Sequence, residues 1–103
     1  MTETNGSPKT TGGSFVRFTL RLLVDEPEKV YIHEMQGTQS VIIEAGVAPE
    51  DMRRVIGRKG RTADALREIL LSIGGKEDRR YVLELIEPDR QLEEIPTLPS
   101  EEE

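Results

Sequence analysis

Four residues, Gly57-Arg58-Lys59-Gly60, interrupt the most regular stretch of the chain and constrain its fold more than any other feature. Before them, Pro49 stands where the first residue of a helix is favoured. After them, apolar residues recur at helical spacing from Arg61 to Ile73, and Gly74-Gly75 predicts the end of that helix. The expected buried positions are Met52, Val55, Ile56, Ala63, Leu66, Ile69, Leu70 and Ile73. The stretch therefore predicts two helices joined by a short loop bounded by glycines.

Strand patterns lie on both sides of this helix pair. Segments 30–35 and 40–47 predict two strands, and the short connection 36–39 predicts that they form an antiparallel hairpin. Segment 80–87 predicts a last strand. Upstream, Ser14 is expected to cap a first helix whose apolar residues are Phe15, Val16, Phe18, Leu20, Leu22 and Leu23. This order predicts an α+β fold in which a three-stranded sheet is covered on one face by three helices.

Composition changes at both ends of this pattern. Residues 1–13 are polar and rich in glycine, so we expect a disordered tail there, followed by one domain over residues 14–88. Residues 89–103 predict a flexible acidic tail. The net charge is −6, but five glutamates lie within 91–103, whereas 53–61 holds five basic residues and no acidic one. Because the local field steers a charged partner, the loop region is expected to attract anions despite the net charge.

The loop has the chemistry of an anion-binding site. Its glycines let the main chain approach a ligand without an intervening Cβ, and it opens directly into the N-terminus of the second helix. Arg58, Lys59 and Arg61 add positive charge at the same place, so a sugar–phosphate backbone would fit. The other interpretation is that Gly57 caps a helix, Gly60 occupies a turn, and the basic side chains are a solvated surface.

The segment Val55-Ile56-Gly57-Arg58-Lys59-Gly60 resembles the signature of KH domains, and the element order is similar to their type II topology. The match is closer to small bacterial single-KH proteins of the KhpA type. It extends over about residues 15–87 and includes Leu22-Leu23-Val24-Asp25 with Pro27, Val47-Ala48-Pro49-Glu50-Asp51-Met52, and Gly60-Arg61 with Ala63, Ala65, Leu66 and Arg67.

This resemblance implies a non-catalytic protein that binds short single-stranded RNA. The loop would clamp the backbone of about four nucleotides, and an apolar groove would hold the bases. The implied RNA-binding residues are Arg54, Ile56, Gly57, Arg58, Lys59, Gly60 and Arg61. The resemblance further implies a role in post-transcriptional regulation or as an RNA chaperone, and association with a second copy or with another KH-containing protein.

Three alternative functions compete with RNA binding. A DNA-binding helix-turn-helix also has two helices around a glycine-containing turn, but Asp64 and Glu68 would face the phosphates. A protein-interaction scaffold would have no need for two cations in the loop. An enzyme is not expected, because the chain has no cysteine, a single histidine (His33), and no Gly-Lys-Ser/Thr ending after its loop. We accordingly expect no cofactor, no metal and no small-molecule substrate.

Two further expectations concern location and the acidic tail. The sequence has neither an apolar run long enough to span a membrane nor an apolar N-terminal stretch of the secretory kind, so a cytoplasmic protein is expected. The glutamates of 91–103 have two interpretations, as a solubility device or as a competitor of RNA for the basic loop.

Overall fold

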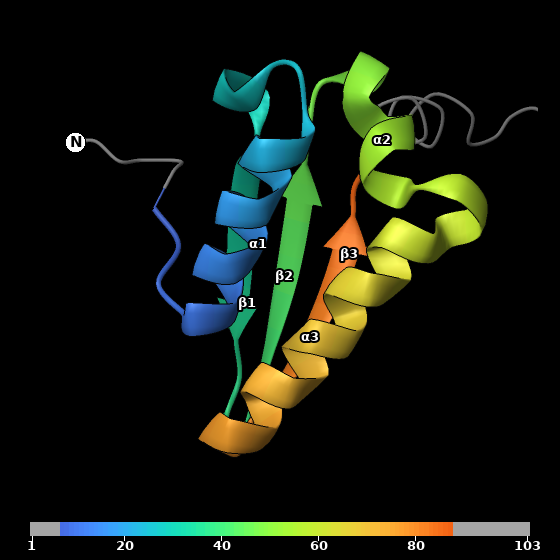
Figure 1. Ribbon diagram of the computed structural model, residues 1–103. Coiled ribbons are helices and arrows are strands. Elements are labelled where there is room, and N and C mark those ends of the chain that lie inside the picture. The colour runs from blue at the N-terminus through green and yellow to red at the C-terminus, as the bar shows by residue number, and fades with distance from the viewer. Residues whose placement is uncertain (1–6, 88–103) are drawn as a thin grey trace, which may run out of the picture.

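The computed structural model describes residues 7–87 and has the element order expected from the sequence (Figure 1). The helices are α1 (Thr11–Leu23), α2 (Met52–Ile56) and α3 (Arg61–Glu77), and the strands are β1 (Tyr31–Gln36), β2 (Ser40–Gly46) and β3 (Arg80–Leu85). Three short 3-10 turns, η1 (Pro27–Lys29), η2 (Pro49–Asp51) and η3 (Arg58–Gly60), precede β1, α2 and α3. The predicted α+β fold is confirmed, while the tail expected over 89–103 lies outside the described residues.

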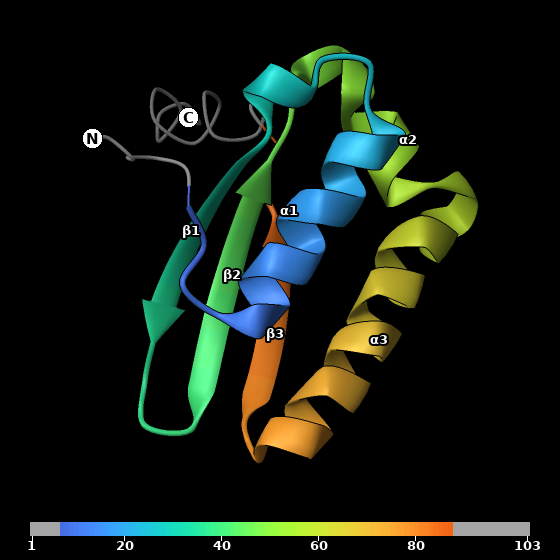
Figure 2. The same ribbon diagram turned by 60° about the vertical axis from the view of Figure 1, so that its left-hand side comes forward.

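The three strands form one mixed sheet in the order β1-β2-β3. The β1–β2 pair is the expected antiparallel hairpin, with Tyr31 opposite Gly46. β2 and β3 run parallel, with Ser40 opposite Arg80. Since parallel neighbours need a crossover, the chain returns through η2, α2, η3 and α3. α1 and α3 cover one face of the sheet, and α2 packs at its upper end (Figure 2).

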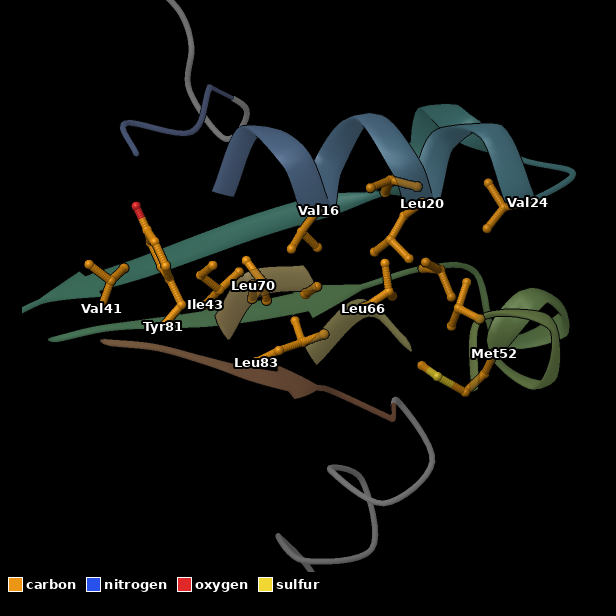
Figure 3. Packing of buried hydrophobic residues seen from close by; sticks show 14 residues of the cluster. Val16, Leu20, Val24, Val41, Ile43, Met52, Leu66, Leu70, Tyr81 and Leu83 are labelled. Atoms are coloured by element: carbon orange, nitrogen blue, oxygen red, sulfur yellow. The ribbon is translucent and has the colours of Figure 1, made fainter. Parts of the chain in front are cut away.

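The core lies between the central strand and these helices (Figure 3). Val41, Ile43 and Ala45 alternate along β2 with side chains that are at most 2% exposed, as their spacing predicts. The residues packed against them are Val16 and Leu20 of α1, Leu66 and Leu70 of α3, and Tyr81 and Leu83 of β3. Burying each such aliphatic side chain contributes about 1.5–3 kcal/mol, so this layer holds both long helices on the sheet.

The start of α1 corrects one prediction. The helix begins at Thr11, and Thr10 rather than Ser14 is its cap, so residues 11–13 of the expected tail are helical. The Thr10 hydroxyl accepts the N–H of Gly13 at 2.9 Å and donates to the carboxylate of Glu34 on β1. Thr10 is only 6% exposed. A contact between residues 24 positions apart therefore determines where the helix starts, and local sequence patterns do not reveal such contacts.

Glycines at the start of α1 allow the helix to approach the sheet. A Cβ on Gly12 would lie 2.5 Å from the ring of Tyr81, and one on Gly13 would overlap the Glu34 carboxylate. Two adjacent glycines are poor helix formers, which is why the sequence pattern predicted disorder here. The tertiary contacts outweigh this local preference.

α3 is longer than predicted. It runs through Gly74 and Gly75 to Glu77 and is capped by Asp78, whose φ is +61°. Gly74 is buried, and a Cβ there would lie 2.3 Å from the carbonyl oxygen of Arg79. Gly74 is therefore needed for close packing of the helix against the turn into β3, and it does not end the helix.

Some apolar residues predicted to be buried lie on the surface. Phe18 and Leu22 of α1 are 66% and 69% exposed, and Ile69 of α3 is 47% exposed. The predicted apolar face of α1 was too broad, because the helix contacts the sheet only along the row that contains Val16 and Leu20. These three side chains on the helix layer are called the outer apolar face below.

Glu77 joins three elements at the lower end of the domain. The hydroxyl of Tyr81 on β3 donates to Glu77 Oε1 at 2.6 Å, and Arg79 Nε lies 3.9 Å from the same oxygen. The hydrogen bond from Tyr81, followed by one with Thr11 of α1, lowers the pKa of Glu77 below its ordinary value of 4.5. The ionised carboxylate is thus stabilised by folding.

This coupling predicts a pH-dependent contribution to stability. Because the folded pKa of Glu77 is lowered, its contribution is complete above the unfolded value of about 4.5 and is lost as the pH falls through the folded pKa. Glu77→Gln should therefore lower the free energy of unfolding near neutral pH, with a smaller difference from wild type at pH 3. Urea denaturation of both proteins across this range tests it. If the free energies of unfolding of the two proteins differed by the same amount at every pH, folding would not lower the pKa of Glu77.

Candidate nucleic-acid interface

The Gly57–Gly60 loop connects α2 to α3 through an unusual backbone path. Gly57 ends α2 by donating its N–H to the carbonyl oxygen of Arg53 at 2.8 Å, and Gly60 donates to the carbonyl oxygen of Gly57 at 3.0 Å. The φ angles of Gly57, Lys59 and Gly60 are +83°, +56° and +76°. Glycine adopts such angles readily, whereas a left-handed conformation at Lys59 costs about 1–2 kcal/mol. The loop thus holds a strained residue with a long cationic side chain.

The two loop glycines have different surroundings. A Cβ on Gly57 would lie 2.3 Å from Thr62 Oγ1 and 2.7 Å from the Thr62 backbone nitrogen. A Cβ on Gly60 would meet no atom within 4 Å. Gly57 is therefore needed so that the loop can pack against the first turn of α3. Gly60 leaves its side of the backbone open to an incoming group.

Positive charge is concentrated around the loop and little of it is neutralised. The side chains of Arg53, Arg58, Lys59 and Arg61 are exposed, and none of them forms an ion pair within residues 7–87. Arg54 differs, since its guanidinium lies 3.6 Å from the carboxylate of Asp25. The loop and its flanking helices therefore present four cations that have no anionic partner in the described domain.

The first turn of α3 adds backbone donors to this positive surface. Gly60 is the N-cap residue, and it has no side chain that could accept a hydrogen bond from the N–H groups of that turn. Arg61 donates its N–H to the carbonyl oxygen of Arg58, but an α-helix begins with four N–H groups that lack helical partners. Together with the positive end of the helix dipole, these donors favour an anionic group beside Gly60.

A buried carboxylate positions α2 and the loop relative to the rest of the fold. Asp51 is 2% exposed, and its two oxygens accept the backbone N–H groups of Asp25 and Glu26, each at 3.1 Å. In the sequence, Asp51 stood out only as part of the segment Val47–Met52 that carries the family resemblance. It anchors η2 to the connection between α1 and β1, and no sequence pattern pointed to this role.

The middle and C-terminal part of α3 and strand β3 border a hollow of about 530 Å³. Its lining residues are Arg67, Leu71, Gly75, Arg79, Arg80, Tyr81, Val82 and Leu83. Leu71 is 67% exposed here, and the Arg67 guanidinium crosses to β3, where Nε and Nη2 donate to the carbonyl oxygen of Leu83 at 3.4 and 3.2 Å. The structure therefore has a partly apolar groove between α3 and β3.

The structure brings most of the predicted site residues together. The loop residues and Arg61 form one exposed cationic surface, and Ile56 is half-buried immediately before it. Arg54 lies on the same short helix but shares its charge with Asp25. The resemblance implied an apolar groove but not its lining residues, and the structure shows that Arg79 and Arg80 are among them. Which of these residues contact a ligand stays a prediction.

The described part of the chain offers no sign of other common site types. No group of three or more histidines, cysteines or acidic residues within 7–87 is arranged to hold a metal ion. None of the helices in that range is both long and apolar enough to cross a membrane.

The mixed three-stranded sheet, the helices on one face, and the glycine-bounded loop between α2 and α3 define a KH domain of type II topology. Comparison with known proteins agrees. The family model described as KhpA/KhpB, KH domain matches residues 13–85. The chain therefore belongs to this family.

Several relatives carry the name RNA-binding protein KhpA. The protein of Caldanaerobacter subterraneus is 45% identical over 74 residues, which cover 72% of this chain and 99% of the relative. That of Aquifex aeolicus is 46% identical over 72 residues, or 70% and 91% of the two chains. That of Clostridium acetobutylicum is 48% identical over 64 residues, which cover 62% of this chain and 85% of the relative. No solved structure gives a significant match to this chain.

The different surroundings of the two glycines predict different stability losses. Gly60→Ala introduces only backbone strain and should lower the free energy of unfolding by about 1 kcal/mol. Gly57→Ala adds an overlap with the Thr62 backbone to this strain. It should therefore lower the free energy of unfolding by more than about 2 kcal/mol. Chemical denaturation of both variants provides the comparison. Equal losses would mean that Gly57 is not closely packed against α3.

Proposed function

We propose that this protein binds short single-stranded RNA without catalysing a reaction. The Gly57–Gly60 loop would clamp the sugar–phosphate backbone, and the observation that carries the proposal is the arrangement around Gly60. Arg58, Lys59 and Arg61, which have no anionic partner in residues 7–87, lie in the same four-residue segment as an uncapped helix N-terminus and the open backbone of Gly60. A phosphate group can use all three features at once, whereas a neutral ligand would leave the charge unused.

The apolar groove supports nucleotides as the ligand. Bases lying beside the loop would contact aliphatic side chains such as Ile56 and Leu71. The chain has two tyrosines and two phenylalanines, too few for a platform on which several bases stack. Contacts to phosphate would therefore dominate, and base selectivity would be weak. The printed name of the relatives, RNA-binding protein, supports RNA as the class of ligand.

The competing functions fit the structure less well. In a helix-turn-helix protein the second helix projects into a DNA groove. Here α3 is packed on the sheet through Leu66 and Leu70, and Asp64 and Glu68 are on its exposed side. A scaffold without RNA affinity would not need the cations around Gly60. We further propose a cytoplasmic location and a role in post-transcriptional regulation or as an RNA chaperone.

The first experiment measures binding of a fluorescent tetranucleotide RNA across a salt series. Wild type should bind, and its affinity should weaken steadily with salt because cations are released from the RNA when phosphates are neutralised. Arg58→Asp combined with Lys59→Asp should reduce affinity at least tenfold, since two attractive charges become repulsive.

A matched double substitution controls for the change in net charge. Arg17→Asp combined with Arg21→Asp alters charge by the same amount on α1, outside the loop segment, and should leave affinity within about twofold. If neither wild type nor the loop variant binds, or if both bind alike, the loop is not an RNA clamp and the scaffold function becomes the better explanation.

We also propose that the outer apolar face mediates association with a second copy or with another KH-containing protein. Phe18 and Leu22 lie four residues apart, on the same side of α1, and α1 contacts α3, which carries Ile69. These three large apolar side chains are 47–69% exposed, and apolar side chains gathered on one surface mark interaction sites more often than ones that are scattered singly. Covering them would remove their contact with water without disturbing the loop.

Phe18→Asp tests this association. Burial of a phenylalanine contributes about 1.5–3 kcal/mol, so its replacement should raise the dimer dissociation constant roughly tenfold or more in analytical ultracentrifugation. Met35→Asp is the control, because Met35 is 41% exposed on β1 and lies outside the outer apolar face. Equal effects of both substitutions would refute the proposal, and a monomeric wild type at high concentration would exclude association with a second copy.

A further inference from the structure

The acidic segment after β3 is the feature of the sequence that the loop-based function does not use. Residues 88–103 hold six carboxylates and one basic residue. They follow the part of the chain that the family model matches, which stops at residue 85. The acidic segment is therefore an addition to the domain that defines the family.

Negative charge is densest at Glu101-Glu102-Glu103, which is called the acidic run below. It is the one place in the sequence where three acidic residues are consecutive. Asp89, by contrast, is followed directly by Arg90. Because like charges repel, three adjacent carboxylates gain more from a cationic partner than a carboxylate beside a basic residue does.

Strand β3 leads the chain toward the Gly57–Gly60 loop. It points to the end of the sheet at which α2 lies, and Ile86 continues its ladder by donating to Ala45 (Figure 1). The Arg67 guanidinium on α3 reaches the carbonyl oxygen of Leu83, so these two residues lie at a similar level. The strand advances about 10 Å from Leu83 to Ile86, and six residues of α3 toward its N-terminus cover about 9 Å. The chain therefore leaves the described domain near the level of the first turn of α3.

The connection is long enough for the acidic run to reach the loop. Residues 88–100 separate the run from the last described residue, Glu87. An extended chain of this length spans up to about 45 Å at 3.3–3.6 Å per residue. The whole of α3, with 17 residues, is only about 26 Å long. A ligand tethered at this range acts at an effective concentration on the order of millimolar, so a weak intrinsic affinity is sufficient.

The loop offers a carboxylate the same partners that it offers a phosphate. Arg58, Lys59 and Arg61 have no anionic partner within residues 7–87. The first N–H groups of α3 lie beside the open backbone of Gly60, and the positive end of a helix stabilises carboxylates as well as phosphates. The acidic run can therefore occupy the position proposed for the RNA backbone.

Other cations of the described domain fit the acidic run less well. Arg54 is paired with Asp25 at 3.6 Å, and Arg79 lies 3.9 Å from Glu77. Asp78 adds a further negative charge at that end of α3. The loop is therefore the part of the described surface where three consecutive carboxylates meet the most uncompensated positive charge.

We propose that the acidic run docks on the loop of the same molecule and competes with RNA for it. This inference rests on the proposed RNA-binding function and adds regulation of the same site. RNA that brings several phosphates displaces the run, because every neutralised phosphate adds to its affinity. A ligand with few phosphates binds only to the fraction of molecules whose loop is free. The acidic run thus raises the affinity that an RNA needs before it is retained.

The first test measures tetranucleotide RNA binding at about 0.15 M salt, where charges more than about 8 Å apart are largely screened. The full-length triple variant Glu101→Gln, Glu102→Gln and Glu103→Gln is compared with wild type. Its affinity should be about threefold higher, which corresponds to a loop that the acidic run occupies in two of three wild-type molecules.

A matched triple variant controls for the change in net charge. It removes three exposed carboxylates that lie on η1, α3 and β3, outside the loop, and that form no ion pair within residues 7–87. The substitutions are Glu28→Gln, Glu68→Gln and Glu84→Gln. Because these carboxylates act on the loop only through the screened field, affinity should stay within about 1.5-fold of wild type.

A spin label tests the docking without RNA. The chain has no cysteine, so Ser100→Cys provides a single attachment site next to the acidic run. In NMR spectra of the RNA-free protein, the label should broaden the amide signals of Lys59 and Gly60. The signal of Gly75, near the other end of α3, should stay sharp. Saturating RNA, or salt at about 1 M, should remove the broadening.

Equal gains in affinity from the two triple variants would overturn the docking, because general repulsion would then explain the effect of the acidic run. Sharp loop signals in the labelled protein, or a broadening that falls on dilution, would also overturn it, since a contact within one molecule does not depend on concentration. Failure of wild type and of both triple variants to bind RNA would instead overturn the loop function on which this proposal rests.

Discussion

The parallel pairing of β2 with β3 is the constraint on which the rest of this structure depends. Two adjacent parallel strands cannot be joined by a tight turn, so the chain has to return from one end of the sheet to the other. The return path passes through α2, the loop and α3, and the apolar side of α3 closes the core over Ile43 and Leu83. The loop consequently lies at the end of the sheet where β2 and β3 terminate. The groove follows from the same geometry, because α3 runs beside an edge strand that has no further neighbour.

Three polar clusters determine where the helices lie on the sheet. Thr10 and Glu34 determine the start of α1, Asp51 joins η2 to the connection before β1, and Glu77 joins the end of α3 to Tyr81. Each cluster satisfies buried or half-buried polar groups that would otherwise destabilise the domain. The loop itself has no comparable internal partners. Its cations and the open side of Gly60 are therefore left available to a ligand, while the positions of α2 and α3 on either side are firmly determined.

Much of this arrangement could be predicted from local patterns. Alternation along β2 identified Val41, Ile43 and Ala45 as core residues, and the apolar spacing around Leu66 and Leu70 identified the inner side of α3. The loop could be predicted from its own residues, because two glycines that flank two cations between helices are typical of an anion-binding loop. The errors arose where one long-range contact outweighed a local preference. Gly12, Gly13 and Gly74 appeared to be helix breakers, yet each lies where another side chain or carbonyl leaves no room for a Cβ. Phe18 and Leu22 appeared to be core residues, although α1 faces the sheet along the row that contains Val16 and Leu20.

By itself, the sequence determined the order of the elements, the inner faces of β2 and α3, and a cationic loop at a helix junction. These properties depend on periodicity and on the conformational preferences of residues close together in the chain. Only the tertiary structure decided which cations are paired with carboxylates. Arg54 forms an ion pair with Asp25, which lies 29 positions away in the sequence, whereas Arg58 forms no ion pair within residues 7–87. It also decided that Arg67 and Arg80 border one hollow with the free edge of β3. Such groupings depend on which segments the crossover brings side by side, and no local pattern encodes the distance between them.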